Sequence, residues 1–138
     1  MPKLLITLML FASVLNVAEA KNTKEVAAYM SGNVLSGNFN CELSNTLSSE
    51  VIKLKLVLSG RENLYEANFY DGKKMVIVGE GLHDPEFPDK FKMNYVHKID
   101  GHTGVMNLNF SNERKDVGGN WYSFASFKLG SITCKKGK

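Results

Sequence analysis

Residues 91–110 read FKMNYVHKIDGHTGVMNLNF, and this stretch decides the fold class. Apolar and polar residues alternate on both sides of Asp100-Gly101, a two-residue sequence typical of a tight β-hairpin. Because a slip of one residue would exchange the two faces of the hairpin, the alternation also indicates the register. With Asp100-Gly101 as the loop, the expected cross-strand pairs are Ile99 with His102, Tyr95 with Met106, and Phe91 with Phe110.

The same period of two extends outward from this hairpin, and Asp71-Gly72 marks a second tight turn. Eight short strands with short connections predict an all-β fold, either a small antiparallel meander barrel or a two-layer sandwich. Besides the two strands of the first hairpin, we expect strands near 39–43, 52–58, 64–70, 73–79, 121–129 and 131–135.

The only two cysteines, Cys41 and Cys134, fall on the first and last predicted strands, more than ninety residues apart. We expect them to form one disulfide, with two buried free thiols as the alternative. If the sheet closes on itself, these strands lie side by side and the bond joins them, which favours the barrel. Closing so long a loop stabilises the fold by about 4 to 5 kcal/mol on chain-entropy grounds.

The N-terminus has the three parts of a secretory signal: a lysine near the start, the apolar run 4–17, and small residues at Ala18 and Ala20. A spanning anchor needs about 20 apolar residues, more than this run provides. We therefore predict a signal peptide over 1–20 and a single β domain over 21–138. The protein is expected to be periplasmic or secreted, with no membrane span in the mature chain.

A helix-capping pattern follows the predicted cleavage site, with Asn22 as the N-cap and Glu25 three residues later. Val26, Tyr29 and Met30 continue at helical spacing. These residues predict one short N-terminal helix over 23–34.

The formal net charge of the 138 residues is +3, with 17 basic and 14 acidic side chains. The lysines are scattered among acids instead of forming a concentrated stripe. We therefore expect no nucleic-acid partner.

Alternating strand direction assigns every connection to one of two ends. Loops 80–90 and 111–120 share one end with residues 59–63, and they are the longest and most highly charged. Binding residues commonly lie on loops that a rigid scaffold holds, so we expect partner contact here. The alternative is that these loops are solvated connectors. The candidate partner-binding residues are Asp84, Glu86, Phe87, Asp89, Arg114 and Lys115.

His97 and His102 share one face of the hairpin near its turn and are the best candidate for a metal pair. No third ligand accompanies them, so we expect hydrogen-bonded rim histidines, no metal and no other cofactor. No serine lies in a G-x-S-x-G sequence, and the acids lie in polar loops. We predict no catalytic residues and no enzymatic activity.

Two functions are favoured, and an enzyme with a site built from residues outside any known motif is the third hypothesis. The first is a protein-binding module, such as an inhibitor or immunity-type protein. The second is a lipocalin-like carrier of a small apolar ligand, although Gly37-Asn38-Phe39 has Phe where that family's Gly-x-Trp has Trp. A closed, filled core would favour the first function. A tunnel lined by Tyr95, Met106 and Phe124 would favour the second.

Overall fold

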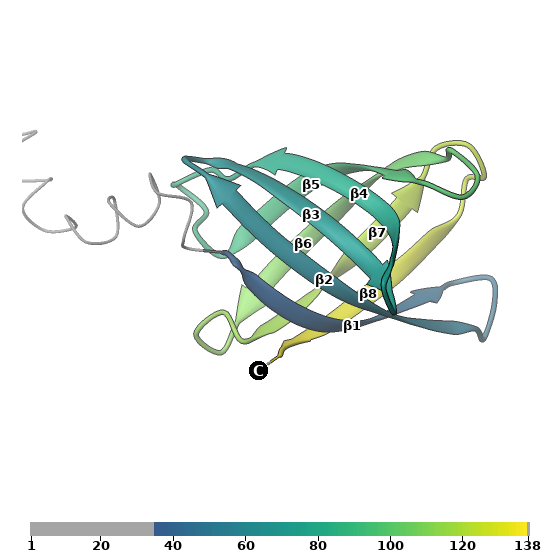
Figure 1. Ribbon diagram of the computed structural model, residues 1–138, viewed down its shortest axis with the longest axis horizontal. Helices are drawn as coiled ribbons and strands as arrows, with labels where there is room; N and C mark the ends of the chain where they lie inside the picture. Colours follow the sequence, from purple (N-terminus) through teal and green to yellow (C-terminus); the bar gives the residue numbers. More distant parts are fainter. Residues whose placement is uncertain (1–34, 138) are drawn as a thin grey trace, which may run out of the picture.

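The computed structural model describes residues 35–137, which form one closed antiparallel barrel (Figure 1). The signal peptide predicted over 1–20 and the helix predicted over 23–34 lie outside the described residues. Each strand pairs with the next along the chain, and the last pairs with the first. The strands are β1 (Gly37–Asn45), β2 (Val51–Arg61), β3 (Leu64–Asp71), β4 (Lys74–Leu82), β5 (Lys90–His97), β6 (Thr103–Ser111), β7 (Asp116–Ser123) and β8 (Leu129–Lys136).

The seam between β1 and β8 confirms the barrel and the disulfide. Cys41 and Cys134 lie directly opposite each other across this seam, with their Cα atoms 4.0 Å apart, and their sulfur atoms are bonded. Both side chains are buried in the barrel interior. The two layers of a sandwich are not formed, and residues 35–137 include no helix, hence none that could span a membrane.

The β5–β6 hairpin has the predicted faces but a different register. Tyr95 pairs with Gly104 instead of Met106, and Phe91 pairs with Leu108 instead of Phe110. A shift of two residues keeps each side chain on its face, which is why alternation could not detect it. The loop is longer than two residues because the Asp100 carboxylate accepts a hydrogen bond from the His102 backbone N–H at 2.9 Å.

The seventh strand also differs from the prediction. It begins at Asp116 and ends at Ser123, so residues 116–120 of the predicted loop 111–120 belong to the sheet. The segment contains Gly118 and Gly119, and glycine weakens the interior of a strand. However, Gly119 faces a carbonyl oxygen of β6 so closely that a Cβ atom would not fit. The chain then reverses over 124–128 and not at Gly130, which lies within β8.

The remaining connections have shorter bounds than the prediction gave. The loop predicted over 80–90 covers only 83–89, because β4 continues to Leu82. We call the end of the barrel that carries connections 62–63, 83–89 and 112–115 the closed end. The other end, with connections 46–50, 72–73, 98–102 and 124–128, is called the open end and lies at the right of Figure 1.

Candidate functional site

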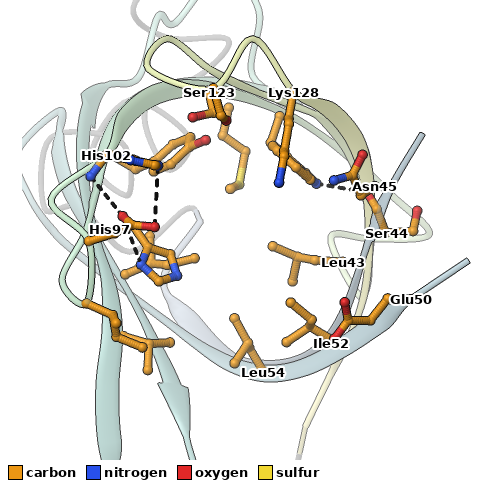
Figure 2. A pocket seen from close by; sticks show the side chains of 18 of the residues that line it. Leu43, Ser44, Asn45, Glu50, Ile52, Leu54, His97, His102, Ser123 and Lys128 are labelled. Carbon is orange, nitrogen blue, oxygen red and sulfur yellow. Dashed lines mark hydrogen bonds and ion pairs between the residues drawn. The ribbon is translucent and has the colours of Figure 1, made fainter. Parts of the chain in front are cut away.

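The barrel is hollow at the open end. A cavity of about 450 Å³ occupies the interior there and opens between the connections (Figure 2). Its wall is mostly apolar, and leucines from β1 and β2 point toward its centre. The apolar lining consists of Leu43, Ile52, Leu54, Val76, Ile77, Tyr95, Ile99, Met106 and Trp121.

A β-bulge shapes one side of this cavity. The pairing of β3 with β4 shifts between Phe69 and Tyr70, so that Phe69 pairs with Ile77 and Tyr70 with Met75. Val76 is the extra residue, and it is buried together with its neighbour Ile77. A regular strand would point one of these two side chains outward, whereas the bulge lets both line the cavity.

Two aromatic residues lie against the wall because glycines on neighbouring strands leave room for them. A Cβ atom on Gly104 would collide with the Tyr95 ring, and one on Gly130 would collide with the Trp121 ring. The Trp121 indole N–H donates a hydrogen bond to the Ser44 carbonyl oxygen at 3.1 Å. The rings therefore cover the wall without filling the centre of the cavity.

Two histidines and a carboxylate form a cluster at the mouth (Figure 2). Asp100 lies between His97 and His102, with carboxylate-to-Nδ1 distances of 3.4 Å and 3.3 Å. The pKa of Asp100 is lowered, chiefly by the hydrogen bond from the His102 backbone N–H, with attraction from both imidazoles adding to it. Burial is the second-largest influence and raises the pKa, but it does not outweigh the others. Within residues 35–137 no group of three side chains has an arrangement that could hold a metal ion.

Lys128 is the cation that faces this cluster across the mouth. It follows the β7–β8 turn, and its side chain points into the opening (Figure 2). Within the part of the chain that the structure describes, Lys128 forms no ion pair. Asn45, Glu50 and Ser126 also contribute polar groups to the lining. An apolar cavity thus ends in a polar mouth with one available ammonium group.

Tyr95 belongs to the cavity wall, and its hydroxyl forms a hydrogen bond with the backbone. It donates a hydrogen bond to the Tyr122 carbonyl oxygen at 3.2 Å. Burial raises the pKa of Tyr95, the negative charge of Asp100 raises it further, and the nearby Ser123 side chain acts in the opposite direction. The phenol is therefore held neutral as a hydrogen-bonding group beside the cavity.

The closed end is filled by side chains. Phe39 packs edge-on against Phe110 at 6.0 Å between ring centroids, and Tyr65 packs in the same way against Phe91 at 5.7 Å. His83 is 1% exposed, lies against Tyr65, and places its Nε2 atom 2.9 Å from the Pro88 carbonyl oxygen. Among residues 35–137, these side chains pack against one another and occupy the interior at this end.

The predicted partner-binding residues surround the closed end, and the structure brings several of them together. Arg114 from the β6–β7 turn lies 3.3 Å from Asp89, which joins this turn to loop 83–89. The Asp84 carboxylate accepts the Glu86 backbone N–H at 2.9 Å. Lys115 instead pairs within its own turn, with Glu113 at 3.7 Å.

Phe87 is 53% exposed at the end of this loop, and the Lys90 ammonium lies 5.8 Å from the centre of its ring. The cavity at the open end and the charged loop cluster with Phe87 at the closed end are thus separate candidate surfaces. A further hollow of about 550 Å³ lies along β3 to β6 and is bordered by Val96 and Phe124.

The sequence hypothesis named only part of the cavity. Tyr95 and Met106 line it as expected for a carrier, but Phe124 lies outside it, with its ring against Tyr122 at 5.5 Å. Trp121 and Lys128 were missed, because the predicted seventh strand ran through the turn that separates them. The run Phe124-Ala-Ser-Phe127 breaks the alternation and was the available signal for that turn.

Comparison with known proteins shows the fold alone. The sequence matches no protein-family profile and no curated protein. A redesigned β-barrel, b11L5F_LGL, is similar with a TM-score of 0.64 and 8% identity, over 79% of this chain and 96% of that one. The redesigned β-barrel mFAP1, bound to DFHBI, is similar with a TM-score of 0.60 and 10% identity, over 78% and 99%. The chain therefore has the architecture of these small closed barrels.

Proposed function

We propose that this chain is an exported, non-catalytic binding protein that holds a small amphiphilic ligand in the open half of its barrel. The observation that carries the proposal is the cavity of about 450 Å³, open to solvent at one end and filled by side chains at the other. Ligand sites are typically concave, mostly apolar, about 300 to 1,000 Å³ in volume, and have few polar groups. An eight-stranded barrel has room for one small ligand at most.

The mouth suggests the chemistry of the ligand. The body would be apolar, since leucine, isoleucine, valine, methionine and tryptophan side chains make up most of the wall. The head would be anionic, because Lys128 is available at the mouth whereas Asp100 already faces two histidines. A medium-chain carboxylate combines both properties. The likeness to mFAP1, which is bound to DFHBI, supports the use of this barrel shape as a ligand scaffold.

Calorimetric titration with decanoate and decanol tests this proposal. We expect one site with a dissociation constant of about 1 to 100 μM for decanoate. Lys128→Gln should weaken decanoate binding about two- to fivefold and leave decanol binding unchanged, as for one solvent-accessible ion pair. Absence of binding by either compound to the folded protein would contradict the proposal.

A blocking variant locates the ligand. Leu54→Trp places a large ring in the cavity and should abolish binding, whereas Asn107→Trp adds the same ring to the exposed outer face of β6 and should not. Circular dichroism and the melting temperature verify that both variants fold. Equal binding by both variants would indicate that the ligand binds outside the barrel interior.

A protein partner at the closed end is the second candidate function, of the inhibitor or immunity type. The observation in its favour is Phe87, an exposed aromatic residue on a loop that a side-chain hydrogen bond stabilises. Loop 83–89 is preformed, because its backbone bonds run from Phe87 N to Asp84 O and from Lys90 N to Phe87 O. Preformed contact residues reduce the entropy lost on binding.

A photo-crosslinking amino acid tests this second function. Placed at position 87 in the mature protein, it should form one discrete adduct in the native extracellular fraction, and Phe87→Ala should remove the partner without lowering the melting temperature. The same group at position 96 is the matched control on the barrel wall. Identical adduct patterns from both positions would contradict a specific site at the closed end.

A further inference from the structure

The connections at the open end carry exposed apolar side chains at their tips. Leu47 is 81% exposed in the β1–β2 loop, Ile99 is 67% exposed in the β5–β6 loop, and Phe127 is 76% exposed in the β7–β8 turn. These three connections project furthest to the right in Figure 1, beyond the β3–β4 turn. Further exposed apolar side chains beside them are Val51, Ile52, Phe124 and Leu129.

Phe127 combines a largely exposed aromatic ring with an unfavourable backbone conformation. Its φ is +52°, in the left-handed region that bulky side chains rarely adopt. Its ring is largely exposed, so burial does not offset the unfavourable backbone conformation. A strained conformation that holds an exposed aromatic outward is an indication of function.

The charges of the two ends differ in sign. The open-end connections carry three lysines against two acids, and one of these acids, Asp100, is shared by two histidines. The closed-end connections carry five acids against two basic residues. The three lysines of the open end are Lys73, Lys98 and Lys128.

Apolar loop tips next to lysines match the surface of an anionic bilayer. Lys98 precedes Ile99, and Lys128 follows Phe127. At a membrane, apolar side chains enter the acyl boundary while long basic side chains remain at the headgroups. Each lysine near an anionic surface contributes about 1 kcal/mol, and acids at the far end of the molecule favour the same orientation.

We propose that the open end is a docking surface for anionic lipid membranes, with Leu47, Ile99 and Phe127 inserted and the adjacent lysines at the headgroups. In this orientation the mouth of the cavity faces the bilayer. The proposal goes beyond ligand binding and rests on the exposed loop tips and the charges. Ile99 and Lys128 border both the cavity and this surface, so binding and docking are tested with separate variants.

Vesicle flotation tests the docking surface with the mature, oxidised protein. Vesicles of phosphatidylcholine containing about 30% phosphatidylserine should bind the protein at low salt, and binding should decrease as the salt is raised to about 0.5 M. Pure phosphatidylcholine should bind it more weakly. No binding to the anionic vesicles, or equal binding to both kinds, would overturn the proposal.

Matched triple variants identify the surface that docks. Leu47→Ser with Ile99→Ser and Phe127→Asn should reduce vesicle partitioning about tenfold or more, since three apolar side chains are lost. Leu64→Ser with Leu82→Ser and Phe87→Ser removes three exposed apolar side chains of the closed end and should leave partitioning unchanged. All six positions are exposed, so both proteins should fold. Equal loss in both variants would overturn the proposal.

Two further measurements separate this proposal from its alternatives. The cavity-blocking variant Leu54→Trp should dock as well as the unmodified protein, so failure of ligand binding and failure of docking are distinguishable. Analytical ultracentrifugation should show a monomer. A dimer that the open-end triple variant dissociates would assign the apolar tips to a second copy of the chain and overturn membrane docking.

Discussion

The two ends of this barrel are built from the same eight strands, but side chains fill the interior at one end and leave a cavity at the other. At the closed end, phenylalanine, tyrosine and histidine side chains of the described residues pack edge-to-face against one another in the interior. At the open end, the largest side chains lie flat on the wall over Gly104 and Gly130. The comparison shows that interior space in a small barrel depends on where aromatic side chains lie as much as on their number.

The disulfide supports both halves, so its loss should have the largest effect. Replacing Cys41 and Cys134 together by alanine should lower the free energy of unfolding by about 4 to 5 kcal/mol, because the bond closes a loop with a sequence separation of 93. Denaturant unfolding measures this. A loss below about 1 kcal/mol would indicate that the β1–β8 hydrogen bonds hold the seam unaided.

Substitutions of two leucines on the same face of β2 compare the packing of the two halves directly. Leu56 lies in the packed interior and is 0% exposed, whereas Leu54 borders the cavity. Leu56→Ala should cost about 3 to 5 kcal/mol in unfolding free energy. Leu54→Ala should cost about 1 to 2 kcal/mol less, because it enlarges an existing cavity and creates no new one. Equal costs would show that the open half is packed in solution.

Substitutions of glycine by alanine test whether Tyr95 lies against the barrel wall. Gly104→Ala should cost about 1 to 3 kcal/mol, since its Cβ would meet the Tyr95 ring and the Tyr122 carbonyl oxygen. Gly118→Ala is the matched control: nothing lies within 4 Å of its added Cβ. Thermal unfolding of both variants tests the difference, and an unaffected Gly104→Ala would mean that Tyr95 does not lie on the wall.

Alkaline pH should give the smallest effect. Because the pKa of Tyr95 is raised in the folded protein, the contribution of its neutral phenol is fully present below about pH 10. Stability should then fall as pH rises through the folded pKa. The melting temperatures of the protein and of Tyr95→Phe should differ below the pKa of the folded protein and converge above it. Parallel curves would mean that ionisation of Tyr95 does not affect stability.

The fold was predictable because strand alternation is a strong signal and the two cysteines sit on the first and last strands. The turn lengths were less so. The hairpin at Asp100 moved by two residues through a side-chain bond to the His102 backbone, and alternation does not respond to such a shift. The position of β7 was hidden by glycines that the sheet requires for close strand approach.

The candidate site was predictable only in part. Tyr95 and Met106 follow from the register of inward residues, whereas the roles of Gly104, Gly130 and Trp121 depend on how the strands meet in space. The filling of the closed end by side chains was not predictable either, because His83 and the loop around it have no periodic pattern.

The most direct test of the central claim is methyl NMR of the protein during titration with decanoate. The account predicts chemical-shift changes for the methyl groups of Leu43, Leu54, Ile77 and Met106, which line the cavity, and none for Leu56, Leu108 and Ile132 in the packed interior. Both sets report on one molecule under one condition, so each is the control for the other. Shifts in neither set, or equal shifts in both, would contradict a ligand site in the open half of the barrel.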